Sequence, residues 1–266
     1  MAFHNQIAGL VRFSYPARSG FAKKPDDIAA LEAELYDPDR LERRFYLFEQ
    51  LTLPSLIAQT DPDFTLAVLV GQGFPARDRL ERALSPLRHA RIVTLPVMHH
   101  YPATQAAFDA VLDPQASHLT SFRLDDDDAV DRNLVARLRA TSAALTRMRD
   151  ADEPVAIGWN RGLFLELDRG GNLISEVVEK LPLGIGLALC APARSRANIF
   201  ARNHRLLPQF FDCWTDARTP AFIRTVHPGN DSSAHMSGRS SSLTLSEIEA
   251  ILAQNFPFTV TDLMRL

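Results

Sequence analysis

The chain has 266 residues, of which 46% are hydrophobic and 23% charged, with 12 glycines and 2 cysteines. This composition predicts a globular protein with a sizeable core, and it excludes a largely disordered, collagen-like or disulfide-rich chain. The net charge of −3 argues against broad nucleic-acid binding, which usually goes with a basic excess.

Strands and helices are predicted to alternate in the first half of the chain. Apolar, β-branched runs indicate strands, and the continuous run at 64–70 (FTLAVLV) is typical of a strand buried on both faces of a parallel sheet. Apolar residues at 3–4 spacing indicate helices, of which the one from 40 is capped by Asp39. In chain order we expect a strand at 7–14, a helix turn at 28–35, helices at 40–51 and 55–59, a strand at 64–70, a helix at 75–87, a strand at 90–95, a helix at 104–112 and a strand at 118–124.

Strands cluster in the second half. In chain order we expect a helix at 132–148 capped by Asp131, strands at 154–159 and 162–167, a hairpin turn at 169–172, strands at 173–178 and 183–191, a helix at 194–202, a strand at 220–226 and a helix at 244–256 capped by Thr244 or Ser246. This order predicts an α/β fold with one mostly parallel sheet flanked by helices, more mixed in its C-terminal half.

The most informative segment is a run of four aspartates, Asp125 to Asp128, directly after the strand predicted at 118–124. Adjacent carboxylates repel one another, so they need solvent, counter-charges or a cation. In an open α/β sheet, ligands bind in the crevice beyond the carboxyl ends of the strands. Mg²⁺ and Mn²⁺ prefer carboxylate oxygens and commonly keep phosphate and water as further ligands. The run therefore predicts a metal site for a phosphate-bearing ligand.

A solvated acidic turn is the alternative interpretation of this run, with Asp128 and Asp131 beside the positive end of the following helix. Solvated carboxylates contribute little to stability, so we expect that substitution of Asp127 by alanine leaves the fold intact. The position after a buried strand favours the metal site over the bare turn.

A second polar cluster, His227 to Ser233 (HPGNDSS), follows the strand predicted at 220–226. Neutral imidazole suits Mn²⁺-like ions, so His227 can join Asp127 and Asp128 as a metal ligand. A Pro-Gly turn with local hydrogen bonds is the alternative.

Two further candidates lie at predicted strand ends. Trp159 can stack on a sugar and Asn160 can bind its hydroxyls, with a core tryptophan as the alternative. The histidine pair at 99–100 is a weaker candidate, because such pairs are more often structural.

Four segments together resemble a known family. RFSY (12–15), LTLPSLIAQTDPDF (51–64), SFRLDDDDAV (121–130) and HPGNDSS (227–233) resemble the rhamnosyltransferase family of bacteria. A helix with Arg44, then a buried strand, then an aspartate run after another strand also resembles glycosyltransferases of the GT-A fold, which carry an Asp-x-Asp motif.

The resemblance implies transfer of a sugar, such as rhamnose, from a nucleotide-diphosphate-sugar donor to a glycan or lipid-linked acceptor. By match to the Asp-x-Asp motif, Asp125 would lie near the ribose or the metal, and Asp127 would bind a Mn²⁺ or Mg²⁺ ion. Asp126 and Asp128 stay in the candidate site because the register is ambiguous by one position. His227 matches the place where many such enzymes supply a late metal or phosphate ligand.

The implied reaction needs stabilisation of its leaving group. Charge builds on the β-phosphate as the glycosidic bond breaks, and a divalent cation with Arg12 or Arg123 can stabilise it, although both arginines could instead be structural. An inverting reaction also needs a carboxylate that deprotonates the acceptor hydroxyl. Asp231 is our first candidate for that base, ahead of Asp212 and Glu179.

We therefore expect a hexosyltransferase with a GT-A-like single domain over residues 1–266, its nucleotide-binding half at about 1–130 and its acceptor-side half at about 131–266. A noncatalytic nucleotide- or carbohydrate-binding protein and a nucleotidyltransferase are the alternatives. The sequence has no stretch that approaches the ~18 apolar residues needed to cross a bilayer, and its N-terminus lacks the order of a signal peptide. We expect a cytoplasmic protein with at most peripheral membrane contact.

Overall fold

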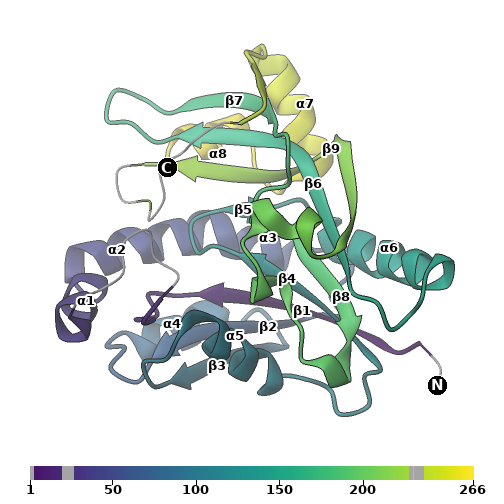
Figure 1. Cartoon of the computed structure of the whole chain (residues 1–266). Coiled ribbons are helices and arrows are strands. Elements are labelled where there is room, and N and C mark those ends of the chain that lie inside the picture. Colours follow the sequence, from purple (N-terminus) through teal and green to yellow (C-terminus); the bar gives the residue numbers. More distant parts are fainter. Residues whose placement is uncertain (1–2, 20–26, 228–229, 231–236) are drawn as a thin grey trace.

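Ten strands form one sheet in the computed structural model, which describes residues 3–19, 27–227, 230 and 237–266 (Figure 1). The strands are β1 (Asn5–Arg12), β2 (Thr65–Gly71), β3 (Ala90–Leu95), β4 (His118–Leu124), β5 (Ala129–Val130), β6 (Val155–Glu166), β7 (Leu173–Val178), β8 (Ala188–Pro192), β9 (Asp212–Val226) and β10 (Arg239–Ser241).

Eight α-helices and several shorter turns connect the described strands. The α-helices are α1 (Ile28–Leu35), α2 (Pro38–Leu47), α3 (Leu53–Ile57), α4 (Arg77–Leu84), α5 (His100–Asp109), α6 (Leu134–Met148), α7 (Leu245–Asn255) and α8 (Val260–Met264). A π-helical turn, η1 (Phe48–Thr52), joins α2 to α3, and the 3-10 turns are η2 (Ala193–Ser195), η3 (Ile199–Ala201) and η4 (His204–Gln209). None of the helices in the described ranges is long and apolar enough to span a bilayer.

The sheet runs in the order β10-β7-β6-β8-β4-β1-β2-β3. β1 pairs in parallel with both β2 and β4, and β2 pairs in parallel with β3. β8 is antiparallel to β4 and β6, and β7 is antiparallel to β6, whereas β9 runs parallel to β6. The predicted class is confirmed: an α/β sheet that is parallel in its N-terminal half and mixed in its C-terminal half.

The strand order reverses at β1. From β1 the chain moves to β2 and β3 on one side, and it then returns to the other side of β1 as β4. Such a switch point leaves a crevice beyond the carboxyl ends of the two central strands, where α/β proteins bind their ligands. Arg12 ends β1, and Asp125 directly follows β4, so both lie at this crevice.

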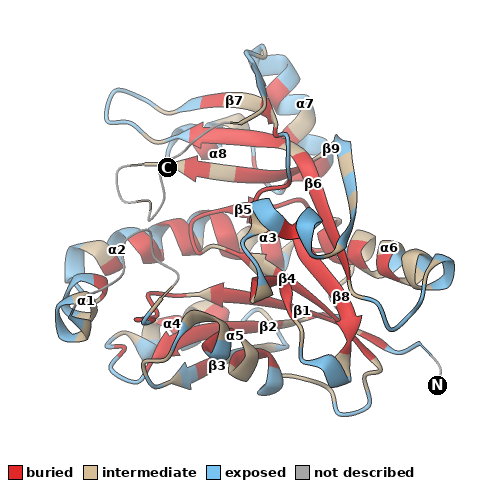
Figure 2. Ribbon diagram, viewed as in Figure 1, coloured by how far each residue is buried: buried red, intermediate tan, exposed pale blue. Residues whose placement is uncertain are grey.

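Helices cover both faces of the parallel part of the sheet. Side chains of α2, α3, α4 and α6 share one apolar core with β1, β2 and β4, while α5 and η3 pack on the other face. A third core joins α7 and α8 to β6 and β9, in the upper part of Figure 1. The central strands β1, β2, β4, β6 and β8 are buried along most of their length, and the outer surfaces of the helices are exposed (Figure 2).

The helix predicted at 40–51 begins earlier than expected. Asp37, and not Asp39, is its N-cap, with the Asp37 side chain accepting a hydrogen bond from Arg40 N at 2.9 Å and Pro38 in the first turn. The helix continues through η1 into α3, instead of stopping before a second helix at 55–59. Pro54 has no N–H to donate and its ring crowds the preceding turn, which fits the wider π-helical turn just before it.

Four predictions for the second half are wrong in detail. The two strands at 154–159 and 162–167 are the single strand β6, because Arg161, between them, pairs with both β7 and β9. The segment predicted as a strand from 183 becomes one only at Ala188, and the helix at 194–202 is a series of 3-10 turns. Asp131 lies before α6, and its side chain accepts a hydrogen bond from Asn133 N, while Asn133 is the N-cap.

Candidate functional site

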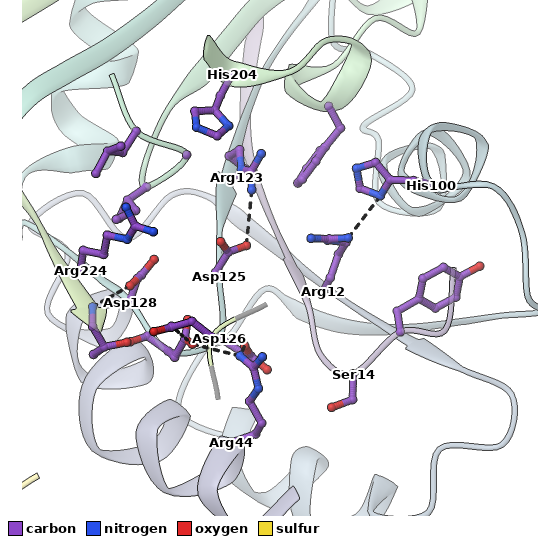
Figure 3. A pocket seen from close by; sticks show the side chains of 18 of the residues that line it. Arg12, Ser14, Arg44, His100, Arg123, Asp125, Asp126, Asp128, His204 and Arg224 are labelled. Carbon is purple, nitrogen blue, oxygen red and sulfur yellow. Dashed lines mark hydrogen bonds and ion pairs between the residues drawn. The ribbon is translucent and has the colours of Figure 1, made fainter. Parts of the chain in front are cut away.

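A cavity of about 680 Å³ opens at the carboxyl ends of β1 and β4 (Figure 3). Its size lies within the range of small-molecule binding sites. Titratable side chains from both halves of the chain dominate its wall: the arginines Arg12, Arg40, Arg44, Arg123, Arg202, Arg205 and Arg224, the aspartates Asp125, Asp126, Asp127 and Asp128, and the histidines His100 and His204.

The acidic turn, residues Asp125 to Asp128, connects β4 to β5. β5 pairs antiparallel with β9 through Ala129↔Ile223. Thr225 of β9 clamps the turn, since its N donates to Asp128 Oδ1 at 2.9 Å and its Oγ1 donates to the Asp127 carbonyl at 2.8 Å. The last three aspartates are only 3–5% exposed, so the solvated turn, which was the alternative interpretation of this run, is not what the structure shows.

Arg44 supplies the counter-charge for this buried turn. Its Nη1 donates to Asp126 Oδ1 at 2.6 Å and to Asp127 Oδ2 at 3.0 Å, and Arg44 itself is 8% exposed. Buried carboxylates persist only when they are paired and hydrogen-bonded. The helix α2 therefore places a cation beneath the turn from a position more than 80 residues earlier in the sequence.

The second polar cluster reaches the same carboxylate. His227 Nε2 lies 3.3 Å from Asp127 Oδ2, and Asn230 Nδ2 donates to the same oxygen at 3.3 Å. With Arg44, this makes three nitrogen partners for one carboxylate oxygen. Asp231 and the rest of HPGNDSS apart from His227 and Asn230 lie outside the described residues, so the role of Asp231 as a base stays a prediction.

Asp125 differs from its three neighbours, because its side chain is 42% exposed and faces the cavity. Burial would raise its pKa, but the charges of Arg123, Arg12 and Arg44 outweigh that effect and lower the pKa below the ordinary value. Arg123 Nη2 lies 3.5 Å from Asp125 Oδ1. Asp125 is therefore an ionised carboxylate in a basic setting.

Asp128 has the opposite character. Burial, together with the negative charges of Asp127 and Asp125, raises the pKa of Asp128 well above its ordinary value, although the bond from Thr225 N lowers it in part. A carboxylate in this position is stabilised by a proton or by a further cation.

The carboxylates of the acidic turn could supply only part of the coordination shell of a metal ion. Within the described residues, no three or more His, Cys, Asp or Glu side chains gather into a group that could hold a metal. The predicted set of Asp127, Asp128 and His227 is therefore not pre-arranged, because Arg44, His227 and Asn230 already surround Asp127 Oδ2. One or two carboxylates with substrate phosphates are nevertheless enough for Mg²⁺. Asp128 is the aspartate of the turn that a proton or a further cation would stabilise.

Two histidines on the wall are neutral at pH 7. Burial lowers the pKa of His100 to about 3, and the charges of Arg12 and Arg123 act in the same direction. Burial also lowers the pKa of His204 to about 4, together with Arg123 and Arg205. Arg12 Nη1 lies 3.5 Å from His100 Nδ1 (Figure 3). The positive charge of the wall therefore comes from arginines, which suit phosphate groups.

Two predicted site residues, Trp159 and Asn160, are not among the residues that line the cavity. Trp159 lies within β6, is 2% exposed and packs edge-on against Trp214 at 6.2 Å between ring centroids. Asn160 is also buried, and its Nδ2 donates to the Glu179 carbonyl at 2.9 Å. β6 continues past Trp159 to Glu166, contrary to the predicted strand end, so no loop carries these two side chains into the crevice.

The other candidates for the base lie away from the cavity. Asp212, at the start of β9, pairs with Arg149 on an exposed surface. Glu179 is buried and accepts hydrogen bonds from Ser237.

Sequence reasoning brought together Arg12, Arg123 and the acidic turn, but it missed much of the wall. It gave no role to Arg44 and did not consider the set Arg40, Arg202, His204, Arg205 and Arg224. The chain has 26 arginines and 3 lysines, and this strong preference is the sequence signal that could have pointed to a phosphate site.

Comparisons with known proteins give one informative match. A family model described as putative rhamnosyl transferase matches residues 6–239. The search of curated proteins gave no match. Among solved structures, S. aureus TarS 1–349 in complex with UDP-GlcNAc aligns at 9% identity and a TM-score of 0.47, over 94% of this chain and 65% of that one, slightly less than two thirds of its length. A cytidylyltransferase from Leptospira borgpetersenii aligns at 8% identity and a TM-score of 0.35, over 99% of this chain and 93% of that one.

Proposed function

Since the chain belongs to the family described as putative rhamnosyl transferase, we propose that it moves a hexose, such as rhamnose, from a nucleotide-diphosphate-sugar donor to a hydroxyl group of an acceptor. The acceptor is a glycan or a lipid-linked molecule. The observation that carries the proposal is the arginine-lined cavity at the switch point of the sheet.

The positions of the arginines suit the leaving group of such a reaction. As the bond between the sugar and the β-phosphate breaks, negative charge builds on the departing nucleoside diphosphate. Arg12 at the end of β1 and Arg123 near the end of β4 lie on the cavity wall, where fixed positive charges stabilise that developing charge. The guanidinium group can also bind phosphate oxygens in a bidentate manner.

A divalent ion is part of this proposal, with Asp128 as its main protein ligand and the diphosphate as the remaining anchor. Mn²⁺ or Mg²⁺ bound there would neutralise the diphosphate and the crowded carboxylates. Asp127 would orient its neighbours through Arg44 and His227, instead of binding the ion as the sequence predicted.

The test is a thermal-shift and calorimetric screen of nucleoside diphosphates and nucleotide-sugars, with and without Mn²⁺. A ligand that binds the folded state raises the apparent melting temperature by mass action. We expect binding that weakens about tenfold or more in Arg12→Gln and Arg123→Gln, since each loses charge-assisted hydrogen bonds. Arg77→Gln is the control, because Arg77 is half exposed on α4 and pairs with Glu81 outside the cavity.

The products of the reaction separate this proposal from its alternatives. Release of nucleoside diphosphate from a nucleotide-sugar supports a glycosyltransferase. Release of pyrophosphate from a nucleoside triphosphate would instead indicate a nucleotidyltransferase, and tight binding without turnover a noncatalytic binding protein. Absence of nucleotide binding under all these conditions would refute the proposal.

A further inference from the structure

The cavity is lined by three further arginines, to which the proposed donor site gives no role. We name Arg202, Arg205 and Arg224 the basic wall; Arg202 and Arg205 flank the start of η4, and Arg224 lies on β9. In Figure 3, Arg224 and Arg12 lie on opposite sides of Arg123 and Asp125. Arg224 is therefore separate from the end of β1.

Two of these guanidinium groups are positioned by aromatic rings. Arg202 lies over the ring of Phe210 at 4.5 Å, and Arg224 over the ring of Phe164 at 5.3 Å. No carboxylate of the described ranges forms an ion pair with Arg202 or Arg224. Arg44 and Arg123, in contrast, each form an ion pair with an aspartate of the acidic turn. Stacking holds the two cations in place and leaves their charge available to a ligand.

The charges of Arg202 and Arg224 leave room for a second anion. Neither guanidinium group forms an ion pair with a carboxylate of the described residues, and a divalent cation bound with the donor would add further positive charge to the cavity. Like charges confined in one cavity repel, and a second anionic group relieves that repulsion.

We propose that the basic wall binds the acceptor, and that the acceptor carries a phosphate group close to the hydroxyl that receives the sugar. The identification of this ligand as the acceptor rests on the proposed function. The existence of a second anion site depends only on the residues of the cavity. Exposed apolar side chains on the same segment, Leu206 and Phe210, would flank such an acceptor at the rim. The phosphate can belong to a soluble phosphorylated glycan or to a lipid.

The experiment titrates inorganic phosphate, and then glycerol phosphate, into the full-length protein by calorimetry. Each titration is run alone and with a saturating nucleoside diphosphate from the screen. We expect phosphate to bind in both cases. Arg202→Gln and Arg224→Gln should each weaken phosphate binding about tenfold, since each removes a charge-assisted contact, and should change nucleoside diphosphate affinity less than about threefold.

Arg194→Gln is the matched control. Arg194 lies in η2, only eight residues before Arg202, but it is exposed and pairs with Asp152 at 2.7 Å, outside the cavity. Its substitution should leave phosphate binding unchanged. An equal loss in Arg194→Gln and Arg202→Gln would overturn the proposal, because general surface charge would then explain the binding.

Competition distinguishes this proposal from the proposed function. If saturating nucleoside diphosphate displaces all phosphate, the cavity has one anion site and the basic wall is not an acceptor site. If nucleotide binds and phosphate does not, the same conclusion holds while the proposed function stands. If phosphate binds through Arg202 and Arg224 but no nucleotide binds, the second anion site stands and the proposed function fails.

Vesicles identify the source of the phosphate. Co-sedimentation with vesicles of phosphatidylcholine containing phosphatidic acid, but not of phosphatidylcholine alone, and its loss in Arg202→Gln would indicate a lipid phosphate. Phosphate binding without such co-sedimentation would indicate a soluble phosphorylated acceptor.

Discussion

Replacing Arg44 by methionine should destabilise the protein far more than replacing an exposed arginine. The change keeps the aliphatic stem that packs beneath the acidic turn, and it removes the cation that lies 2.6 Å from Asp126 Oδ1 and 3.0 Å from Asp127 Oδ2. Both carboxylates then remain buried without this counter-charge. Breaking a buried ion pair in this way costs about 3–5 kcal/mol of unfolding free energy.

The expected change in melting temperature follows from the length of the chain. At about 2.1 cal/mol/K per residue, unfolding 266 residues has an entropy of roughly 0.6 kcal/mol/K near the transition, so the loss corresponds to a drop of about 5–9 °C. Urea unfolding at pH 7, followed by circular dichroism, measures the free energy directly. Arg77→Met is the control, and its half-exposed pair with Glu81 should cost less than about 1 kcal/mol.

A second variant tests the cause. Adding Asp126→Asn and Asp127→Asn to Arg44→Met removes the uncompensated charges, so most of the lost stability should return. The reasoning would be refuted if Arg44→Met costs no more than Arg77→Met. It would equally be refuted if the triple variant is as unstable as Arg44→Met, since the effect would then be one of packing alone.

Three further predictions concern the cavity and its surroundings. The pKa values of His100 and His204 are lowered to about 3 and about 4, so protonation of these histidines favours the unfolded chain. Their contribution to stability should be complete above pH 6.5 and should decline as pH falls, with a loss of at most about 2 kcal/mol per histidine at pH 5. Urea titrations of His100→Gln and His204→Gln should therefore show a flatter pH profile of unfolding free energy than the wild type. Gly184→Ala should weaken nucleoside diphosphate binding by calorimetry, because an added Cβ would lie 2.7 Å from Arg123 Nε, whereas Gly170→Ala, with open space around it, should bind normally. Asp128→Asn should keep the wild-type fold by circular dichroism, since its Oδ1 still accepts from the backbone, and should abolish the effect of Mn²⁺ on nucleotide binding; an unchanged Mn²⁺ effect would remove Asp128 from the metal site.

Local sequence patterns determined much of the architecture. The strands at 90–95 and 118–124 have the predicted bounds, and the second is buried along nearly all of its length. The helix turn at 28–35 and the Thr244 cap of α7 are also as predicted, since caps and apolar spacing are local properties. Such patterns do not predict the bounds of a strand that depend on its neighbours. The polar middle of β6 stays in the strand because it pairs with β7 and β9.

The sequence also located the acidic run at the end of a central strand, but not its surroundings. Whether four aspartates are solvated or buried depends on what lies beside them in space. The tertiary structure places Arg44, from more than 80 residues before, and His227, from 100 residues after, against Asp127. The pairing of β5 with β9 brings His227 to Asp127, and the packing of α2 brings Arg44 there; neither contact is visible in the local sequence pattern. Strand pairing between distant segments therefore decided that the run is a buried, charge-compensated turn within an arginine-lined cavity.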